Sequence, residues 1–463
     1  MKYYVLIGFF FLAVVAEAQL YLESTVLRSE VVAEGLHAPW EITWGPDDWI
    51  WFTERNGKIS RLNPQTGEID LIAQIPDVYQ VQVSGMFGLA LHPNFQDTSQ
   101  LFVVYTYLEE EVMKEKLVRY TYEAGTLQDP LVIIDNIPAA TIRNGSRIIA
   151  TPDRKIIMTT GDINQPQISQ DVNYLNGKTL RVNFDGSVPE DNPIPGSYVW
   201  SWGHRNAQGL VWAENGIVYS SEHADKNDDE LNIIQKGKNY GWIEVQGYCD
   251  TPEEQKYCKE NNVKEALMAW SLSIAPCGLT YYNHEAIPEW RNTLLLATLK
   301  EDDLRVLKLS EDGLSVISES VYFNNEFGRL RDVCVSPTGD IYLTTSNQQD
   351  TKADDGFPVF GDDKIIKISP INNPFFASDK KIVKIYPDPV DDCTTIRISS
   401  IYEPSQQILN LHIYNTLGQN LQRIRLDAEN EVILSNYEYK AGIYFYHLFD
   451  GNKNVDAGKF IIR

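Results

Sequence analysis

The stretch at residues 45–54 (GPDDWIWFTE), with residues 58–62 (KISRL) after it, decides the fold of this chain. It joins a turn rich in Pro and Asp, an alternating apolar strand that ends in a hydroxyl residue, and a second strand with basic residues. The same phrase returns at residues 152–160, 215–221 and 337–345, and weaker copies lie at residues 102–105 and 293–297.

Short strands of period two, separated by turn residues and with almost no helical periodicity, are typical of all-β structure. Repetition at blade-length intervals favours a propeller, in which the loops of one face converge at the axis. About six units fit the spacing, so we expect a six-bladed β-propeller over residues 28–370. A β-sandwich is the alternative, and so many related copies in one chain argue against it.

Composition limits the partners of the protein. The 463 residues are 43% hydrophobic and 11% aromatic, which is enough for a large core and indicates two domains. The formal net charge of -24 argues against nucleic acid or an anionic membrane as the main ligand, because both bind cationic surfaces.

The first 18 residues read as a signal peptide. Lys2 gives the positive start, residues 3–15 an apolar run, and residues 16–18 (AEA) a small-x-small cleavage site. The run is shorter than the roughly 20 apolar residues of a membrane anchor, and no later segment is long enough to span. We therefore expect an exported chain that has no transmembrane segment once the signal is removed.

Cysteines are few, with five in the whole chain. Cys249 and Cys258 enclose a short polar loop and form the best candidate disulfide in an oxidising compartment. The pairing of the other three is left open by the sequence.

The repeated phrase lapses after residue 370, and residues 371–381 read as a polar linker. A new alternation begins at Ile382 and predicts a small β-sandwich over residues 382–463. Its phrases at residues 385–392, 411–419 and 441–446 resemble, in order, the C-terminal sorting domain of the type IX secretion system. The resemblance implies a tail recognised by the type IX secretion machinery, and a protein that passes the periplasm of a Gram-negative bacterium to become secreted or cell-surface. A carbohydrate-binding or adhesive sandwich is the alternative.

Polar residues gather in the middle of the chain. Residues 202–210 (WGHRNAQGL) precede residues 221–225 (SEHAD) and 228–232 (DDELN), and together they bring a cation, amides, carboxylates and glycines between apolar strands. This combination indicates a functional site.

A series of short motifs runs through the region from about residue 36 to 370. They lie at residues 53–55 (TER), 88–93 (GLALHP), 160–162 (TGD), 177–183 (GKTLRVN), 185–189 (DGSVP), 203–210 (GHRNAQGL), 239–242 (NYGW) and 329–332 (RLRD). In these motifs and their order the region resembles the soluble quinoprotein glucose and sorbosone dehydrogenase family, whose cofactor is pyrroloquinoline quinone (PQQ).

The resemblance implies a cofactor site. Lys300, Arg329 and Arg331 match the cations that bind the cofactor carboxylates, and arginine forks suit carboxylates. Arg205 and Asn206 match the residues that contact the quinone oxygens. For each residue taken singly, an inter-blade salt bridge or other structural contact is the alternative.

The resemblance also implies calcium, which prefers oxygen ligands. Ala224 and Asp225 match a Gly-Pro pair whose backbone carbonyls bind the ion that holds the cofactor, and Asp225 has a carboxylate to add. Glu230 and the backbone of Tyr240 match a second, structural calcium site, for which ordinary loop hydrogen bonding is the alternative.

The main departure from the family lies at the position of the catalytic base. The family places there a histidine that takes the proton of the sugar hydroxyl, and this chain has Arg143 at that position. A guanidinium stays protonated and has no acceptor lone pair, so Arg143 cannot replace the histidine. Asp162, which orients the histidine in the family, is retained, and it is expected to pair with Arg143 or to serve as the base itself.

Other departures and candidates surround that position. Val83 replaces a polar residue near the substrate, and Ile142 replaces an acidic one. His223 is the next candidate proton acceptor after Asp162, whereas His92 and His204 read as structural histidines. The catalytic set is therefore predicted as Asp162, Arg205 and Arg143.

Two functions remain open from the sequence. The first is an exported quinoprotein oxidoreductase that uses PQQ and calcium to oxidise a hydroxyl of an aldose-type sugar. The second is a catalytically impaired propeller of the same family that binds a glycan or a protein, which the substitution at Arg143 supports. A calcium-dependent propeller hydrolase ranks last because the family phrases point elsewhere.

Overall fold

The computed structural model describes residues 19–22, 24–348, 356–371, 383–386, 388–390, 393–398, 409–416, 419–426, 431–435, 439–451 and 453–463. The predicted signal peptide and nearly all of the predicted linker, residues 372–381, lie outside these residues. The described chain divides into two compact units, one formed by Arg28–Ser369 and the other by Pro370–Arg463 together with Gln19–Leu27.

Six sheets follow one another between residues 19 and 371 in the described chain, and five of them are four-stranded and antiparallel. The sixth has the order β1-β2-β25-β24-β23. The strands are β1 (Gln19–Tyr21), β2 (Val26–Ala33), β3 (Pro39–Trp44), β4 (Ile50–Glu54), β5 (Lys58–Leu62), β6 (Ile69–Gln74), β7 (Met86–Leu91), β8 (Gln100–Glu109), β9 (Val112–Glu123), β10 (Thr126–Pro138), β11 (Gly145–Ala150), β12 (Lys155–Thr160), β13 (Lys178–Asn183), β14 (Val199–Trp202), β15 (Ala207–Trp212), β16 (Val218–Glu222), β17 (Asp229–Ile233), β18 (Met268–Trp270), β19 (Pro276–Tyr282), β20 (Thr293–Thr298), β21 (Leu304–Leu309), β22 (Val316–Tyr322), β23 (Leu330–Val335), β24 (Ile341–Thr345) and β25 (Ile365–Ile371).

Helices are rare. The described residues hold two α-helices, α1 (Phe95–Thr98) and α2 (Pro252–Asn261), and two short 3-10 helices, η1 (Pro166–Ser169) and η2 (Pro288–Trp290). The all-β class predicted from the sequence is therefore confirmed. None of the helices in the described ranges has the length and apolar character needed to cross a membrane.

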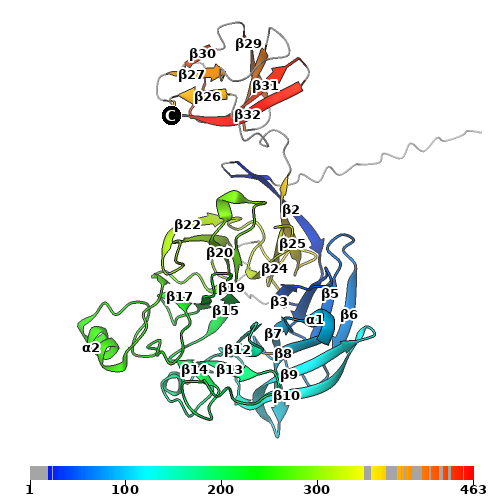
Figure 1. Ribbon diagram of the computed structural model, residues 1–463, viewed down its shortest axis with the longest axis vertical. Helices are drawn as coiled ribbons and strands as arrows, with labels where there is room; N and C mark the ends of the chain where they lie inside the picture. Colours follow the sequence, from blue (N-terminus) through cyan, green and yellow to red (C-terminus); the bar gives the residue numbers. More distant parts are fainter. Residues whose placement is uncertain are drawn as a thin grey trace, which may run out of the picture. The chain divides into compact units, whose positions relative to one another are not determined.

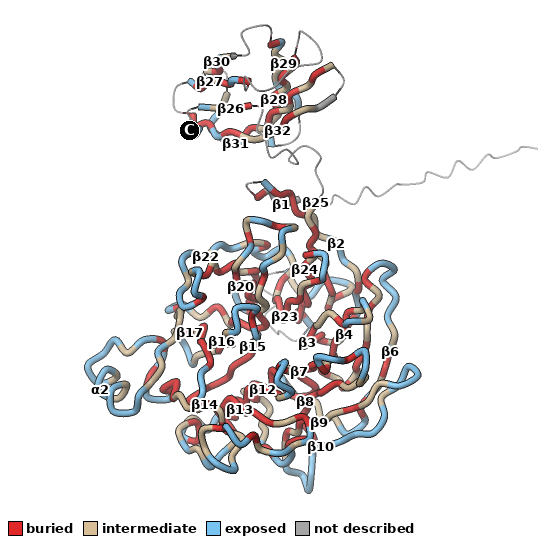
Figure 2. Tube along the Cα trace, viewed as in Figure 1, coloured by how far each residue is buried: buried red, intermediate tan, exposed pale blue. Residues whose placement is uncertain are grey.

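The innermost strand of each sheet contacts the innermost strand of the next. These strands are β3, β7, β11, β15, β19 and β23, and the contacts run in that order and return from β23 to β3. The sheets accordingly surround a common centre in Figure 1. The inner strands are mostly buried, while the outermost strands such as β6 and β22 carry the exposed residues (Figure 2).

The hydroxyl residue that ends the repeated strand joins neighbouring sheets. Thr159 on β12 accepts a hydrogen bond from the Arg147 backbone N–H on β11 and donates one to the Ala207 carbonyl on β15, both 3.0 Å long. Thr53 on β4 makes the same pair of bonds, from the Glu41 N–H and to the Phe87 carbonyl. In both sheets the inner strand is irregular in register beside this residue, so the hydroxyl satisfies a backbone N–H that the ladder leaves unpaired.

The acidic turn residue of the phrase pairs with the basic residue one strand further on. Asp47 binds Arg61 at 3.1 Å, Asp153 binds Arg181 at 3.0 Å, and Asp340 binds Lys367 at 3.0 Å. Two of these arginines also lie over tryptophan rings, Arg61 on Trp49 and Arg181 on Trp200. The repeated aspartate and basic residue therefore bind the turn before one strand to the next strand of the same sheet.

Glycine allows the inner strands to approach closely. A Cβ added at Gly209 on β15 would lie 2.2 Å from the Cys277 carbonyl on β19, and one at Gly278 would lie 1.7 Å from the Asp332 carboxylate on β23. Real Cβ atoms do not occur at such distances, so the centre of this unit tolerates no side chain at these two positions.

A buried ion pair crosses the centre. Arg147 on β11 contacts Asp332 on β23 at 2.7 Å and Glu41 on β3 at 2.9 Å, and its guanidinium lies over Trp40. A cavity of about 490 Å³ lies next to these charges and is lined by the later residues of all six inner strands. The ion pair thus closes one end of that cavity.

The loop after β17 differs from its prediction. Cys249 and Cys258 form a disulfide, as expected, but the segment between them enters the helix α2 instead of remaining a loop. Thr251 and Glu254 form a complete capping box at its start, and a Pro stands in the first turn. Local capping therefore produced a helix that hydrophobic periodicity alone did not reveal. Cys277 and Cys334 are buried free thiols, and Cys393 is an exposed one.

The second unit contains two sheets in the described residues, ordered β26-β27-β30 and β29-β28-β31-β32. One hydrophobic cluster includes residues of both sheets, among them Val383, Ile396, Leu411 and Phe460. The strands are β26 (Val383–Tyr386), β27 (Cys393–Ile398), β28 (Leu409–Tyr414), β29 (Asn420–Leu426), β30 (Glu431–Ser435), β31 (Gly442–Asp450) and β32 (Lys453–Ile462).

We predict that Thr159→Val lowers the free energy of unfolding by about 1–3 kcal/mol, because it leaves a buried N–H and a buried carbonyl without partners while keeping the side-chain shape. Urea unfolding of the full chain measures the change. Thr121→Val on β9 is the matched control, since the Thr121 hydroxyl makes no hydrogen bond within the described chain, and its effect is expected to be much smaller. Equal losses in the two variants would contradict the bridging role.

Candidate cofactor and catalytic site

The predicted site residues lie at one end of the inner strands. Arg143 stands in the loop before β11, Arg205 and Asn206 directly before β15, and Arg329 and Arg331 at the start of β23. Because successive inner strands contact one another in a closed cycle, their first residues surround the same region. This is the end away from the cavity described above, which is lined by the later residues of the strands.

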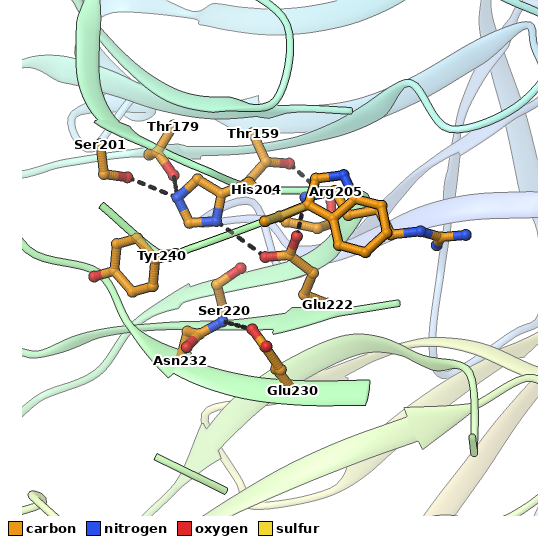
Figure 3. Close-up of polar contacts among 12 residues, drawn as sticks. Thr159, Thr179, Ser201, His204, Arg205, Ser220, Glu222, Glu230, Asn232 and Tyr240 are labelled. Carbon is orange, nitrogen blue, oxygen red and sulfur yellow. Dashed lines mark hydrogen bonds and ion pairs between the residues drawn. The ribbon is translucent and has the colours of Figure 1, made fainter. Parts of the chain in front are cut away.

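Glu222, the last residue of β16, holds the Arg205 loop in place. Its Oε1 accepts hydrogen bonds from the backbone N–H groups of Arg205 and Asn206, and its Oε2 lies 3.0 Å from His204 Nδ1. His204 is also bonded to Ser201 and stacks on Tyr240, so the carboxylate and the ring are both fixed (Figure 3). The Arg205 side chain points away from this cluster.

An amide chain joins the Arg205 loop to β23. Asn206 Oδ1 accepts bonds from the Gly145 N–H and from Gln208 Nε2, each 3.2 Å long. Gln208 Oε1 in turn accepts a bond from Arg331 Nη1 at 3.2 Å. The two groups that the family resemblance assigns to the quinone and to the carboxylates are therefore connected through one glutamine.

Arg329 binds the loop that carries Lys300. Arg329 Nη1 donates to the Leu299 carbonyl at 2.5 Å, and the neighbouring Lys300 donates from its ammonium to the Ser273 carbonyl at 2.8 Å. Lys300 is exposed, whereas Arg331 is buried. The predicted cations thus include one at the surface and one in the interior of the same end of the unit.

Arg55 is a site residue that the sequence reasoning missed. It follows β4 and is only 1% exposed, yet its Nε and Nη1 have no hydrogen-bond partner in the described chain. Burial, together with repulsion from Arg331 and Arg329, holds the pKa of Arg55 well below its usual value. Arg331 Nε and Arg205 Nε are likewise buried without partners. The TER motif at residues 53–55 contains Arg55, but the motif by itself indicates family membership and does not show that Arg55 belongs to the site.

We define this cluster as Arg55, Arg205, Arg329 and Arg331. Within the described chain Arg55 and Arg331 form no ion pair with a carboxylate, whereas Arg205 pairs with Asp225. Buried polar groups are normally hydrogen-bonded, and a buried charge is costly without a partner. Several fixed, unsatisfied guanidinium N–H groups in one region favour a ligand with several anionic oxygens. A ligand with three carboxylates and a quinone, such as PQQ, fits these donors.

Arg143 pairs with two carboxylates. Its Nη1 lies 3.6 Å from Asp162 Oδ2, and its Nη2 lies 3.1 Å from Asp225 Oδ1. The pairing with Asp162 agrees with one of the two roles predicted for that carboxylate. The loop of Val83 lies alongside, since its N–H donates to the Thr141 carbonyl at 3.2 Å, and Val83 is exposed.

Asp162 is completely buried. Its Oδ1 accepts a bond from the Asn164 N–H and its Oδ2 one from Trp242 Nε1 at 3.0 Å. Burial raises the pKa of Asp162 above its ordinary value, although the Asn164 N–H, Arg143 and Trp242 oppose the shift. Asp162 therefore has the raised basicity that suits a general base, but Arg143 contacts the same oxygen that Trp242 binds.

The histidines fall into the expected groups. His204 is fully buried and bonded through both nitrogens, and His92 is buried with its Nδ1 accepting the Asn94 N–H, so both are structural, as predicted. His223 has a buried Nε2 without a partner in the described residues, and burial lowers the pKa of its imidazole to about 4. His223 is therefore neutral at physiological pH.

The predicted calcium ligands differ in how well their surroundings suit a cation. The Asp225 carboxylate is held by Arg143 and by Arg205, whose Nη2 lies 3.0 Å away, so this side chain does not fit as a calcium ligand here. Glu230 lies opposite Glu222 across the β16–β17 pair, and burial with the charge of Glu222 raises the pKa of Glu230 to about 8. Asn232 Oδ1 is buried beside it without a partner in the described chain, so these oxygen atoms suit a cation (Figure 3).

No group of three or more His, Cys, Asp or Glu residues in the described ranges is arranged to hold a metal ion. Sites built mainly from backbone carbonyls, such as those expected at Ala224 and Tyr240, do not depend on such a group. The four calcium assignments, Ala224, Asp225, Glu230 and Tyr240, stay predictions.

Two family models match this chain. The family model for glucose / sorbosone dehydrogenase matches residues 36–352. The chain belongs to this family. A second model, the secretion system C-terminal sorting domain, matches residues 384–463, so the family domain is followed by a sorting domain.

Relatives of the glucose / sorbosone dehydrogenase family cover most of the chain. Quinoprotein glucose dehydrogenase B of Acinetobacter calcoaceticus is 29% identical over 416 residues, covering 71% of this chain and 87% of the relative. Aldose sugar dehydrogenase YliI of Escherichia coli is 27% identical over 350 residues, covering 70% and 92%.

A solved structure, the PQQ-bound aldose sugar dehydrogenase of Streptomyces coelicolor, is similar with a TM-score of 0.65 and 29% identity, and the match covers 74% of this chain and 98% of that one.

We predict that Trp242→Phe lowers the free energy of unfolding by about 1–3 kcal/mol at neutral pH, because buried Asp162 loses a hydrogen bond. The bond favours the charged carboxylate, so its loss raises the pKa of Asp162 further. The deficit is therefore full above that pKa and shrinks as the pH falls through it. Urea unfolding at several pH values measures this. Trp44→Phe is the control, since the Trp44 indole N–H has no partner in the described residues; an equal, pH-independent loss in both variants would refute the role.

Proposed function

We propose that this protein is an exported quinoprotein oxidoreductase that uses PQQ and calcium to oxidise a hydroxyl of an aldose-type sugar. The observation that carries the proposal is the pair of buried arginines Arg55 and Arg331, which form no ion pair within the described chain and lie in one cluster with Arg205 and Arg329. Family membership and the PQQ-bound relative agree with this reading.

In this proposal the arginines hold the cofactor. Arg329, Arg331 and the exposed Lys300 bind its carboxylates, while Arg205 and Asn206 contact the quinone oxygens and are kept in position by Glu222 and Gln208. When bound, the quinone accepts the two electrons and the hydrogen that leave the CH–OH carbon. The chain supplies position, charge and a base.

The base we propose is Asp162, which takes the proton of the sugar hydroxyl. Its carboxylate contacts Arg143, which shares the Asp225 carboxylate with Arg205, and burial raises the pKa of Asp162 above its ordinary value. Arg143 must move aside or share Oδ2 for this transfer, because it contacts Asp162 in the present arrangement.

We further propose that the six sheets are the blades of a six-bladed propeller and that their axial loops carry the cofactor residues. The C-terminal unit is a small β-sandwich over residues 382–463 that delivers the protein to the type IX secretion machinery. The signal peptide at residues 1–18 directs the protein through the periplasm of a Gram-negative bacterium to the cell surface or the medium. Residues 28–370 form the dehydrogenase domain, and residues 371–381 form the linker.

A second function is favoured by one observation. Arg143 occupies the place of the family histidine and is bound to both Asp162 and Asp225, so no unpaired carboxylate is left beside it. This arrangement suits a catalytically impaired propeller that binds a glycan or protein through its axial loops.

Reconstitution of the purified full chain tests the proposal. We expect PQQ to bind in calorimetry, with a loss of affinity when calcium is chelated, and dye reduction over a sugar panel. Arg55→Met should weaken PQQ binding about 10–100-fold, because one charge-assisted interaction is lost. The same change should raise the melting temperature of the cofactor-free protein, since an uncompensated buried charge is removed.

Arg119→Met, a change on β9 outside the site, is the control and should leave PQQ affinity unchanged. Binding of PQQ without dye reduction would favour the impaired module, and absence of PQQ binding would refute the quinoprotein assignment.

Arg143→His restores the family base and yields a sharper prediction. If the loop is aligned correctly, dye reduction with glucose should rise by about 100-fold or more, which is the usual contribution of a general base. Arg154→His, at a residue with a similar positive φ of 62° against 61° at Arg143, is the control and should have no effect. An Arg143→His protein that binds PQQ and stays inert would show that position 143 is not the base position.

A further inference from the structure

Two of the positions at which this chain departs from the family pattern touch each other. Arg143 stands where the family has its histidine, and Asp225 stands where it has the proline of a Gly-Pro pair. Arg143 Nη2 lies 3.1 Å from Asp225 Oδ1, and Arg205 Nη2 lies 3.0 Å from the same oxygen. One carboxylate oxygen therefore bridges two guanidinium groups that come from separate sheets.

The two arginines need an anion between them. Burial and the charge of Arg143 both lower the pKa of Arg205, which shows that the guanidinium groups repel each other. Asp162 balances Arg143 from the buried side at 3.6 Å. On the open side, the balancing charge comes from Asp225 alone among the carboxylates that contact either arginine in the described chain.

The backbone at both arginines is anchored, and Asp225 is the most exposed of the three side chains. Arg205 donates to the His223 carbonyl at 2.9 Å and its backbone is bound to Glu222, while the Arg143 carbonyl accepts the Ile163 N–H at 3.1 Å. Asp225 instead lies in the turn between β16 and β17, and its side chain is 41% exposed. A carboxylate from solution can therefore replace it without disturbing the fold.

Arg143 also lies where a substrate would meet the protein. It is partly exposed and adjoins the exposed loop of Val83. A guanidinium accepts no proton, but its paired N–H groups bind carboxylates in a fork geometry that neutral hydroxyls do not reproduce.

We infer that Arg143 and Arg205 form a carboxylate-binding fork, and that the substrate of this site is an acidic sugar such as a uronic acid in place of a neutral aldose. Asp225 fills the fork when the substrate is absent and yields it to the sugar carboxylate. This inference rests on the proposed function, and it changes only which sugar is bound. The sugar carboxylate takes no part in the oxidation and serves to orient the molecule.

Binding to the full chain tests the inference without any need for turnover. Calorimetry at low salt compares glucuronate and galacturonate with glucose and galactose. We expect the uronates to bind at least about tenfold more tightly, as one charge-assisted pair provides, and the preference to weaken with added salt. Asp225→Asn should strengthen uronate binding about tenfold because the competing carboxylate loses its charge.

Arg143→Met should abolish the preference for uronates, whereas Arg154→Met is the matched control. Both arginines have positive φ angles, 61° and 62°, so the two variants share any backbone effect. Equal affinity for uronates and neutral sugars, or an unchanged preference in Arg143→Met, would overturn the inference.

Dye reduction with the PQQ-loaded protein separates the two hypotheses. Faster oxidation of neutral aldoses than of uronates would refute the acidic-sugar inference and leave the dehydrogenase intact. Uronate binding that depends on Arg143, without PQQ binding, would refute the dehydrogenase and leave the carboxylate fork standing.

Discussion

The close approach of six inner strands at one centre is the constraint on which the rest of this protein depends. It leaves no room for a Cβ at Gly209 or Gly278, and it leaves backbone N–H groups without ladder partners where the strands are irregular. Thr53 and Thr159 satisfy those groups and at the same time bind the next strand of the cycle. The same packing brings the first residues of all six strands together, so that side chains distant in sequence share one site.

The candidate site also depends on the packing of the inner strands. Its arginines come from three sheets and are kept near one another by strand contacts, because like charges do not attract. Arg55 is the clearest case, since burial and its like-charged neighbours both disfavour its charge. Such an arrangement suits an anionic ligand, because a polyanion bound there would reduce the repulsion between the guanidinium groups. The glutamate and glutamine that hold the Arg205 and Arg331 ends then determine where the anion can lie.

The fold was readable from the sequence because the repeated phrase contains its own cross-contacts. The turn aspartates at 47, 153 and 340 pair with basic residues in three of the sheets, and the hydroxyl residues at 53 and 159 bridge inner strands in two of them. The site was readable only in part. Arg205 and Asn206 lie in a conspicuous motif. The buried state of Arg55 and the contact between Arg143 and Asp225, which are 82 positions apart, depend on tertiary packing that no local pattern reports. The helix α2 was missed because two capping residues, and not an apolar face, define it.

The sheet that contains β23, β24 and β25 takes its next strand, β2, from the beginning of the chain. Arg28 on β2 donates a hydrogen bond to Ser369 across 341 positions of sequence. Chain closure over such a separation is slow and cannot occur before the last strand has been made. A chain that emerges amino terminus first therefore cannot pair β2 with its neighbour in this sheet until β25 has also emerged.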